Sequence, residues 1–476
     1  MSAPANNPAE TPVVAIIGGG FTGASVAWHL ARAVTAPAQI VVIEPRPKLG
    51  QGLAYSTADP SHRINVPAAR MTMDCADEGG LQKWIEAARP DLSPGTEAEG
   101  GGLFPQRGLV ADYVSDNLAP LLASGQVRHV QSVATWVHRG ERFCIFCQDG
   151  TELEADLLVI ASGHPPPGIP QAFRDLEGSP RLIADSAQAG RISQVAAEDG
   201  EVLVVGTGLT AADVIASLDR QGFQGRITAL SRRGLRSRGH VFGYPESPSD
   251  FATRPARSAL ELLRNIRAAV RLDIGAGLPW QATLDNVRRD GPAIWAALDL
   301  AQRARLLKKL RVWWDVHRFR IAPQVAGVLD RLIDHSRLRI LAARLQSAQQ
   351  DDTGLWVEWR TRGGKTGRGR FDRVILATGP AHDSILHSSP VLASLADAGL
   401  VRPDALRLGL DVTEGCLAVG SNGQPTPGIL VAGPLARSHV GELMGVPEVT
   451  AHAELVAARL AASLARAERS LQDADL

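Results

Sequence analysis

Two short apolar runs in this chain end in glycine and lead into a helical pattern. "VVAII" at 13–17 precedes "GGGFTGASVAWHLARA", and "VLVV" at 202–205 precedes "GTGLTAADVIASL". Continuous apolar runs of this length are typical of buried strands, and apolar positions three or four residues apart indicate helices. "QIVVI" at 39–43 and "RITAL" at 226–230 each read as the next strand. The pattern therefore predicts two β-α-β units with parallel sheet.

The rest of the chain divides into strands and one helical stretch. Residues 127–161 read as short strands ending in "ASG" at 161–163, and "GLWVEWRTR" with "FDRVILATG" repeats this pattern up to residue 379. Residues 251–344 are helical and basic, with 18 Lys and Arg against 8 Asp and Glu. We interpret them as a solvated helical insertion, and a specific anion or partner site is the alternative.

Composition narrows the class of protein. The 476 residues are 45% hydrophobic, and Lys plus Arg and Asp plus Glu both number 50, so net charge favours neither nucleic acid nor an anionic membrane as a partner. Four cysteines are too few for a disulfide framework. The first eleven residues lack signal-peptide features and are expected to be disordered. The expected location is the cytoplasm, and no run is long enough to span a bilayer.

The first glycine turn has the GxGxxG spacing of a dinucleotide-binding site. Gly18 would allow the tight turn, Gly20 the approach of a pyrophosphate, and Gly23 close packing of helix on strand. Glu44 ends the next strand, where its carboxylate can accept hydrogen bonds from ribose hydroxyls and would repel a 2′-phosphate. This unit therefore favours FAD or NAD over NADP.

The second glycine turn differs where the ribose would lie. Gly206 and Gly208 keep the spacing and Ala211 replaces the third glycine, but the following strand ends in Ser231, Arg232 and Arg233. Arginines can bind a 2′-phosphate through charge-assisted hydrogen bonds, so this unit favours NADP. Two solvated surface arginines are the alternative interpretation.

Cys144 and Cys147 form a CxxC pair in a strand-like stretch. A spacing of three places two strand side chains on opposite faces, so structural cysteines are favoured over a dithiol relay. No second CxxC or nearby His pair completes a zinc site, and no metal is expected.

The chain resembles the flavoproteins that have two dinucleotide-binding domains, a group that includes the class B flavin monooxygenases, the amine N-hydroxylases among them, and the pyridine nucleotide reductases. The resemblance covers nearly the whole chain. "EPRPKLGQGLAYSTADPSHRINVPAARM", "GTGLTAADV", "LSRRGL", "WWDVHRFRIAP" and "GPLARSHVGELMGVPEV" are similar to a bacterial family of FAD/NAD(P)-binding proteins.

This resemblance implies FAD on the first unit, NADPH on the second, and an FAD domain closed by a C-terminal segment from residue 428. Gly433 would lie near the flavin, but Pro434 replaces the acid that usually follows. "FPQRGLVADY" resembles the FPxR segment of the N-hydroxylases, which would place Arg107 at FAD; an ordinary helix start is the alternative.

No catalytic residue can be identified from the sequence. His62, Asn65 and Arg70 are the polar residues we expect nearest the flavin ring, although a structural role for His62 is equally consistent with the pattern. The expected cofactor contacts are Gly18, Gly20, Gly23, Glu44, Arg46, Arg107, Gly163, Gly206, Gly208, Thr210, Ser231, Arg232, Arg233, Gly379, Gly433 and Pro434.

The predicted fold is α/β, with two Rossmann-like dinucleotide-binding domains and a helical insertion in the second. Residues 12–197 and 366–476 are assigned to a discontinuous FAD domain, and 198–365 to an NADPH domain with the insertion at about 251–344.

The resulting hypothesis is an NADPH-dependent flavin monooxygenase that forms a C4a-hydroperoxide and oxygenates a small, amine-like substrate. The ketone- and sulfide-oxidising fingerprint FxGxxxHxxxW is missing. A reductase passing electrons to a small or protein acceptor, and a nucleotide-sensing flavoprotein without turnover, are the alternatives. The expected partners are the substrate and O₂, and a homo-oligomer is left open.

Overall fold

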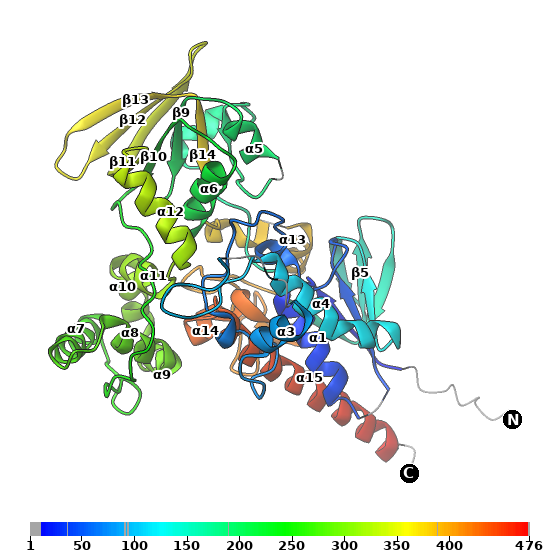
Figure 1. The fold of residues 1–476 in the computed structure, drawn as a ribbon. Coiled ribbons are helices and arrows are strands. Elements are labelled where there is room, and N and C mark those ends of the chain that lie inside the picture. The colour runs from blue at the N-terminus through cyan, green and yellow to red at the C-terminus, as the bar shows by residue number, and fades with distance from the viewer. Residues whose placement is uncertain are drawn as a thin grey trace, which may run out of the picture.

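The structure of this chain is a computed structural model that describes residues 11–474, apart from 36, 90, 91, 93, 94, 189 and 388. The segment expected to be disordered, 1–11, lies outside the described residues except for its last member. Figure 1 shows an N-terminal α/β domain, a second α/β domain above it, and a lobe of helices below the second domain and beside the first. None of the described helices is both long and apolar enough to cross a membrane.

The first domain is built on a six-stranded sheet in the order β15-β16-β7-β1-β2-β3. Its strands are parallel except for the β15–β16 pair. The four apolar residues 14–17 of β1 are all buried, as expected for a strand covered on both faces. The strands are β1 (Val13–Ile17), β2 (Gln39–Ile43), β3 (Val127–Val130), β7 (Leu157–Ile160), β15 (Leu417–Val419) and β16 (Pro425–Val431).

Helices cover one face of this sheet, and a small antiparallel sheet with α13 covers the other. The helices of the first domain are α1 (Phe21–Ala33), α2 (Gly52–Tyr55), η1 (Ala68–Arg70), α3 (Gly80–Ala88), α4 (Gly108–Ala123), η3 (His382–His387), α13 (Pro390–Asp397), η4 (Gly433–Ala436), α14 (Arg437–Val440) and α15 (Val446–Ala474). The small sheet contains β4 (Ala134–Arg139), β5 (Phe143–Cys147) and β6 (Glu152–Ala155).

The second domain has a seven-stranded sheet in the order β13-β12-β11-β10-β9-β14-β8. Strands β8 to β11 and β14 pair in parallel, and β12 and β13 extend β11 as an antiparallel hairpin. The strands are β8 (Leu182–Ile183), β9 (Glu201–Val205), β10 (Arg226–Ser231), β11 (Leu338–Gln350), β12 (Leu355–Thr361), β13 (Thr366–Phe371) and β14 (Arg373–Leu376). The helices are η2 (Gln171–Leu176), α5 (Arg191–Ala196), α6 (Leu209–Arg220) and α12 (Pro323–Asp334).

The sheet pairing corrects the domain boundaries expected from the sequence. The expected boundaries place β8, β13 and β14 in the first domain, but all three hydrogen-bond in the second sheet. There, β13 pairs with β12, and β14 pairs with β9 and β8. The chain instead crosses between domains at two neighbouring segments. The N–H of Gly168 donates to the Gly379 carbonyl at 3.3 Å, and the Thr378 hydroxyl donates to the Gly168 carbonyl at 2.8 Å. Strand pairing between distant segments has no signal in a single sequence.

The basic helical insertion is shorter than expected. The helical lobe contains α7 (Ala259–Gly275), α8 (Trp280–Arg289), α9 (Gly291–Ala297), α10 (Leu300–Lys309) and α11 (Arg311–Arg318). It has a small core of its own, which includes Phe251, Leu262 and Ile294. The last part of the expected insertion, residues 323–344, belongs to the second domain, because β11 pairs with β10 and α12 lies beside α6.

Candidate cofactor-binding site

The two glycine turns have the same backbone geometry. Gly18 follows β1 with φ +99°, and Gly206 follows β9 with φ +134°, a region that favours glycine. A Cβ atom on Gly18 would overlap the carbonyl of Ala161, and one on Gly206 would overlap the carbonyl of Ala377. Gly18 therefore permits close contact with the chain just after β7, at the "ASG" segment. Gly206 permits the same contact with the chain just after β14, at the "ATG" segment.

Each turn also presents an uncapped helix N-terminus. Gly20 and Gly208 are the N-caps of α1 and α6, no side chain caps either helix, and neither has an acid in its first turn. Free N–H groups and the positive end of the helix dipole at such a site attract an anion such as a pyrophosphate. A Cβ on Gly208 would meet no atom within 4 Å, so the space beside this turn is open.

Glu44 lies beside the first turn, but it is already partly paired. Its buried carboxylate accepts hydrogen bonds from the Gly19 N–H at 2.9 Å, the Arg46 N–H at 3.1 Å and the Arg46 guanidinium at 3.0 Å. A carboxylate has about four acceptor positions, so one remains for a ribose hydroxyl. Arg46 offsets the negative charge, which weakens the repulsion of a 2′-phosphate expected from Glu44 alone.

Two buried polar atoms near the first turn have no hydrogen-bond partner among the described residues. They are the side-chain oxygen Oε1 of Gln51 and the hydroxyl of Ser162. Gln51 follows Gly50, whose N–H donates to Gly19, and Ser162 follows the Ala161 carbonyl that contacts Gly18. Because buried polar atoms are nearly always paired, these two fit a site completed by a polar ligand. The residues around the first turn therefore fit FAD.

The C-terminal segment reaches this site through Gly433. Gly433 has φ +72°, and a Cβ there would overlap the Thr22 side chain in the first turn of α1. Its N–H donates to the imidazole Nδ1 of His452 at 3.2 Å. Pro434 is the second residue of the 3-10 turn η4 and offers neither an N–H nor a carboxylate. The segment thus lies where a closing segment was expected, and His452 is a residue that the sequence analysis missed.

The tautomer of His452 follows from its partners. Because Nδ1 accepts from a backbone N–H, the proton lies on Nε2, which is 3.6 Å from the Sγ atom of the buried Cys416. Burial, with a smaller contribution from His439, lowers the pKa of His452 to about 4. The ring is therefore neutral at physiological pH, as its role as an acceptor requires.

The end of β10 is arranged as a loop with two exposed arginines. The Ser231 hydroxyl accepts hydrogen bonds from the Thr207 hydroxyl at 2.8 Å and from the Gly234 N–H at 3.0 Å, so its side chain holds the loop against the glycine turn. Arg232 is exposed and makes no ion pair with the described residues. The Arg233 guanidinium lies 5.6 Å from the centre of the Trp313 ring, and Thr210 is exposed at the start of α6. These positions are compatible with a 2′-phosphate contact.

The three residues expected nearest the flavin ring all touch other parts of the chain. His62 lies between the Thr57 hydroxyl at 2.8 Å and the Ser217 hydroxyl of α6 at 3.0 Å. The Asn65 carbonyl contacts His240 Nε2 at 3.1 Å, and the exposed Arg70 is 3.7 Å from Asp285 in α8. Burial lowers the pKa of His62 despite the nearby Asp213. The segment holding these residues therefore forms an interface between domains.

Arg107 belongs to the same interface. Its guanidinium forms an ion pair with Asp213 of α6 at 2.9 Å and donates to the Arg63 carbonyl at 3.1 Å. Two turns further along α6, Arg220 pairs with Asp59 at 3.1 Å. Burial opposes ionisation of Asp59, but hydrogen bonds from Ser61 and Arg220 outweigh it and hold its pKa at about 2. Sequence reasoning missed this face of α6, because its polar residues resemble an ordinary solvated helix side.

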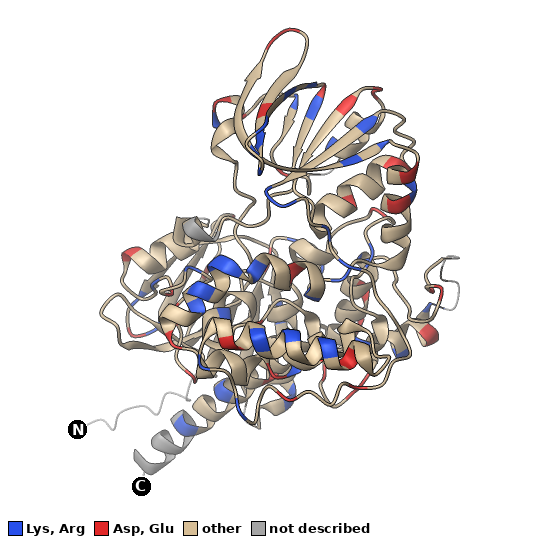
Figure 2. Cartoon of the chain, turned by 90° about the vertical axis from the view of Figure 1, so that its left-hand side faces the viewer, with Lys and Arg blue, Asp and Glu red and all other residues tan. Residues whose placement is uncertain are grey.

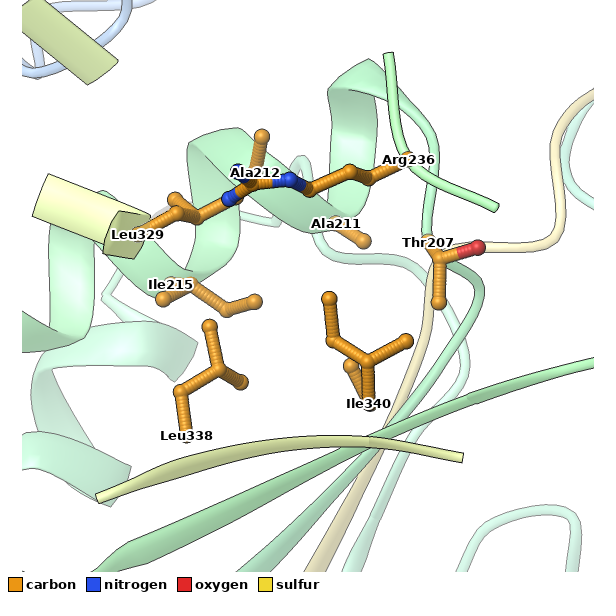
Figure 3. Close-up of a pocket in the computed structure, with 9 residues that line it drawn as sticks. Thr207, Ala211, Ala212, Ile215, Arg236, Leu329, Leu338 and Ile340 are labelled. Carbon is orange, nitrogen blue, oxygen red and sulfur yellow. The ribbon is translucent and has the colours of Figure 1, made fainter. Parts of the chain in front are cut away.

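Figure 3 shows a small cavity behind the second glycine turn. It lies between α6, α12 and the sheet, is lined mainly by Ala211, Ala212, Ile215, Leu329 and Leu338, and holds about 10 Å³. That volume corresponds to at most one water molecule, so this cavity is a packing gap rather than a ligand site.

The two cysteines of the CxxC pair lie in β5, away from this cavity. Cys147 is buried and Cys144 is half-buried, and both are free thiols.

Comparisons with known proteins agree with this geometry. Residues 15–165 match the model of the FAD-NAD(P)-binding family, and residues 112–237 match that of L-lysine 6-monooxygenase/L-ornithine 5-monooxygenase. No curated protein sequence matches the chain.

Many solved structures have a similar fold, and three of them serve as examples. L-lysine 6-monooxygenase from Pseudomonas syringae has a TM-score of 0.64 at 19% identity, covering 96% of this chain and 100% of that one. The reduced ornithine hydroxylase from Pseudomonas aeruginosa has 0.62 at 16%, covering 95% and 99%. Ornithine N-hydroxylase from Kutzneria sp. 744, with reduced FAD, NADP⁺ and L-ornithine, has 0.58 at 16%, covering 96% and 99%.

The fold places this chain among the α/β proteins with two Rossmann-like dinucleotide-binding domains, and the predicted fold class is confirmed. FAD and NAD(P) are the cofactors named by the family model matched over 15–165, and the family match over 112–237 is to the lysine and ornithine monooxygenases. The matched region runs from α4 through the second glycine turn to the arginines after β10.

Proposed function

We propose that this chain is an FAD-containing, NADPH-dependent monooxygenase that oxygenates a small, amine-like substrate. The observation that carries the proposal is the pair of glycine turns, built alike at Gly18 and Gly206 but followed by different charges at Glu44 and Arg232. The family match to lysine and ornithine monooxygenases supports the choice of reaction.

The residues of the first unit would hold FAD. Gly20 and the uncapped start of α1 would receive the pyrophosphate, Glu44 a ribose hydroxyl, and the segment around Gly433 would close the site. Gly18 and Gly23 allow the turn itself, and Arg46 offsets part of the negative charge of Glu44. When bound, flavin and nicotinamide supply the hydride transfer and oxygen activation that side chains cannot provide.

The residues of the second unit would hold NADPH. Gly208 leaves room for a pyrophosphate at the start of α6, next to Thr210, and Arg232 and Arg233 would contact the 2′-phosphate. Ser231 positions their loop through its hydrogen bonds to Thr207 and Gly234. Gly163 follows β7 and Gly379 follows β14, and both have positive φ. These two glycines would line the passage between the two sites.

The overall reaction balances with components that the proposal names. NADPH, a proton, O₂ and a primary amine would yield NADP⁺, water and the N-hydroxylamine. The four cysteines are free thiols, which supports the cytoplasm as the location, where NADPH and O₂ are available.

Turnover under air tests this proposal directly. Purified protein that contains FAD is incubated with NADPH and a panel of amines, including L-lysine and L-ornithine, and NADPH loss, O₂ uptake and hydroxylamine are measured together. We expect one hydroxylamine for each NADPH with the correct amine. NADPH oxidation without an oxygenated product would favour a reductase, and bound FAD without NADPH oxidation would favour a nucleotide-sensing protein.

A further inference from the structure

The outer face of α7 carries a straight stripe of arginines between two exposed apolar residues. Leu260, Arg264, Arg267, Arg271 and Ile274 follow each other at spacings of four and three, which places them in one line along a helix. All five side chains are exposed, Leu260 to 52% and Ile274 to 59%. The line runs from residue 260 to residue 274, a distance of about 21 Å at 1.5 Å per residue.

This stripe belongs to a surface whose positive charges have no internal partner. Eight exposed cations of the lobe form no ion pair with the described residues: Arg254, Arg257, Arg264, Arg267, Arg271, Arg305, Lys308 and Lys309. Figure 2 shows Lys and Arg gathered on the lobe helices that face the viewer. The chain as a whole has no net charge, so this concentration of positive charge is local.

The inner side of the same lobe is built differently. There, Arg288 and Arg318 pair with Glu448 of α15, and Arg320 pairs with Asp285 at 2.6 Å. The Trp295 indole N–H also donates to the Ser438 carbonyl at 2.8 Å. The inner cations are thus matched by carboxylates, and Arg288 and Arg318 hold the lobe against the C-terminal segment. The outer cations named above have no such match.

The arginine stripe lowers the stability of the isolated chain. Like charges three and four residues apart on a helix repel each other, and Arg264, Arg267 and Arg271 stand at these spacings. The one acid in the first turn of α7, Glu261, accepts a hydrogen bond from the Arg257 N–H. The stripe therefore has no evident role in folding, and its exposed Leu and Ile add apolar area that a partner could bury.

We propose that this face of α7 docks an acidic helix of a partner protein. Carboxylates at matching spacings would face the three arginines, and apolar residues at the two ends would cover Leu260 and Ile274. A membrane fits less well, because the arginines interrupt the apolar positions instead of leaving one apolar face. A symmetric dimer through α7 would place arginines against arginines. This inference is independent of the proposed monooxygenase activity.

The experiment measures binding of a designed peptide to the full-length, FAD-bound protein. The probe is a fluorescent, end-capped helical peptide of 21 residues, with Glu at three positions spaced three and four residues apart and Leu near each end. We expect saturable binding that weakens as salt rises from 50 to about 300 mM. Arg264→Glu with Arg267→Glu and Arg271→Glu should weaken it at least tenfold, and a peptide with Lys in place of Glu should bind this variant instead.

Matched controls separate docking from general charge attraction. Arg360→Glu with Arg362→Glu and Lys365→Glu removes three exposed cations from the β12–β13 hairpin and should leave binding unchanged. Leu260→Gln with Ile274→Gln keeps the charge and should still weaken binding severalfold. If the hairpin variant lost as much affinity as the α7 variant, or if the apolar pair had no effect, specific docking would be wrong.

The remaining outcomes identify other occupants. Binding of the wild-type protein to vesicles of 30% phosphatidylserine in phosphatidylcholine, lost in the α7 variant while no peptide binds, would overturn the protein-docking proposal in favour of a membrane. A concentration-dependent dimer that dissociates in the α7 variant would indicate a second copy instead. If the charge-reversed variant folds poorly, the Arg→Gln triple variant answers the same question, with FAD content and circular dichroism as folding checks.

Discussion

The main-chain N–H of Gly433 donates to the imidazole Nδ1 of His452, joining the C-terminal segment to the first turns of α15. The same glycine lies against Thr22 at the start of α1. His452 therefore positions the segment that would close the FAD site, although it lies 19 residues further along the chain. His452 also lies near Pro434, the residue that stands where the resemblance to the two-domain flavoproteins implies an acid.

We expect two substitutions of His452 to behave differently. In His452→Asn the amide oxygen can accept the Gly433 N–H, so the protein should retain most of its FAD. In His452→Leu the N–H loses its buried partner, which costs about 1–3 kcal/mol and should lower the FAD content and the thermal midpoint. Absorbance at 450 nm against 280 nm measures bound FAD. Equal FAD content in the two variants would show that the hydrogen bond does not position the segment.

Gly208→Ala tests the second dinucleotide site without disturbing the fold. Gly208 has φ −86°, and an added Cβ meets no atom of the protein within 4 Å, so the thermal midpoint should change by only a few degrees. The methyl group would instead obstruct a pyrophosphate, and the Kd for NADPH should rise at least tenfold. Titration of NADPH by isothermal calorimetry measures this.

Gly206→Ala is the matched contrast. Its Cβ would overlap the Ala377 carbonyl at a φ of +134°, so this variant should be destabilised as well as impaired in NADPH binding. Unaltered NADPH binding by Gly208→Ala would rule out a pyrophosphate at the start of α6.

Arg232 should decide the choice between NADPH and NADH. Because it has no ion-pair partner in the described chain, Arg232→Ala should leave stability unchanged. Loss of a charge-assisted contact worth about 1.5–3 kcal/mol would raise the KM for NADPH roughly 10- to 100-fold and leave that for NADH nearly the same. Steady-state kinetics with both nucleotides measures the ratio. Arg339→Ala, an exposed arginine on β11, is the control.

Arg107 can be assigned to FAD or to the domain interface by comparison with Asp213. If the 2.9 Å ion pair is its role, Arg107→Gln and Asp213→Asn should destabilise the protein similarly, by about 1–2 kcal/mol, and the double variant should be no worse than either. FAD content should then stay at the wild-type level in all three. Loss of FAD in Arg107→Gln alone would instead indicate the cofactor contact expected from the FPxR resemblance.

Stability should fall on acidification between about pH 6.5 and 4. Burial lowers the pKa of His164, His240 and His452 to about 4, so these rings stay neutral in the folded chain. In the unfolded chain they take up protons near pH 6.5, which favours unfolding as pH falls through that window. At about 1.4 kcal/mol per pKa unit, the combined loss is on the order of several kcal/mol.

Asp315 should act in the opposite direction. Partial burial raises its pKa to about 6, despite the nearby Arg311, so its protonation below that pH relieves the cost of a partly buried charge. In Asp315→Asn the acid-induced loss should therefore be steeper than in the wild-type protein. Urea unfolding at pH 7.5, 6 and 5 measures both effects. A wild-type stability that is constant across this range would contradict the histidine assignment.

The local elements of both cofactor units could be predicted because their signals are local. An apolar run, glycines at fixed spacing and an amphipathic helix follow each other within about 30 residues, and the structure has β1, α1, β2 and β9, α6, β10 at those places. The difference in charge between Glu44 and Arg232 could equally be predicted from the sequence, because each residue lies at the end of a predicted strand. The domain boundaries could not be predicted, because β8 and β14 join the second sheet by pairing with distant partners.

The sequence by itself determined the two glycine turns, the helices that follow them and the difference in charge between the two units, since each depends on neighbouring residues. Only the tertiary structure showed that Arg46 neutralises part of Glu44, that His62 and Arg107 meet α6, and that His452 holds Gly433. These contacts join residues that the fold brings together from distant parts of the chain, and their side chains have no spacing by which a single sequence could reveal them.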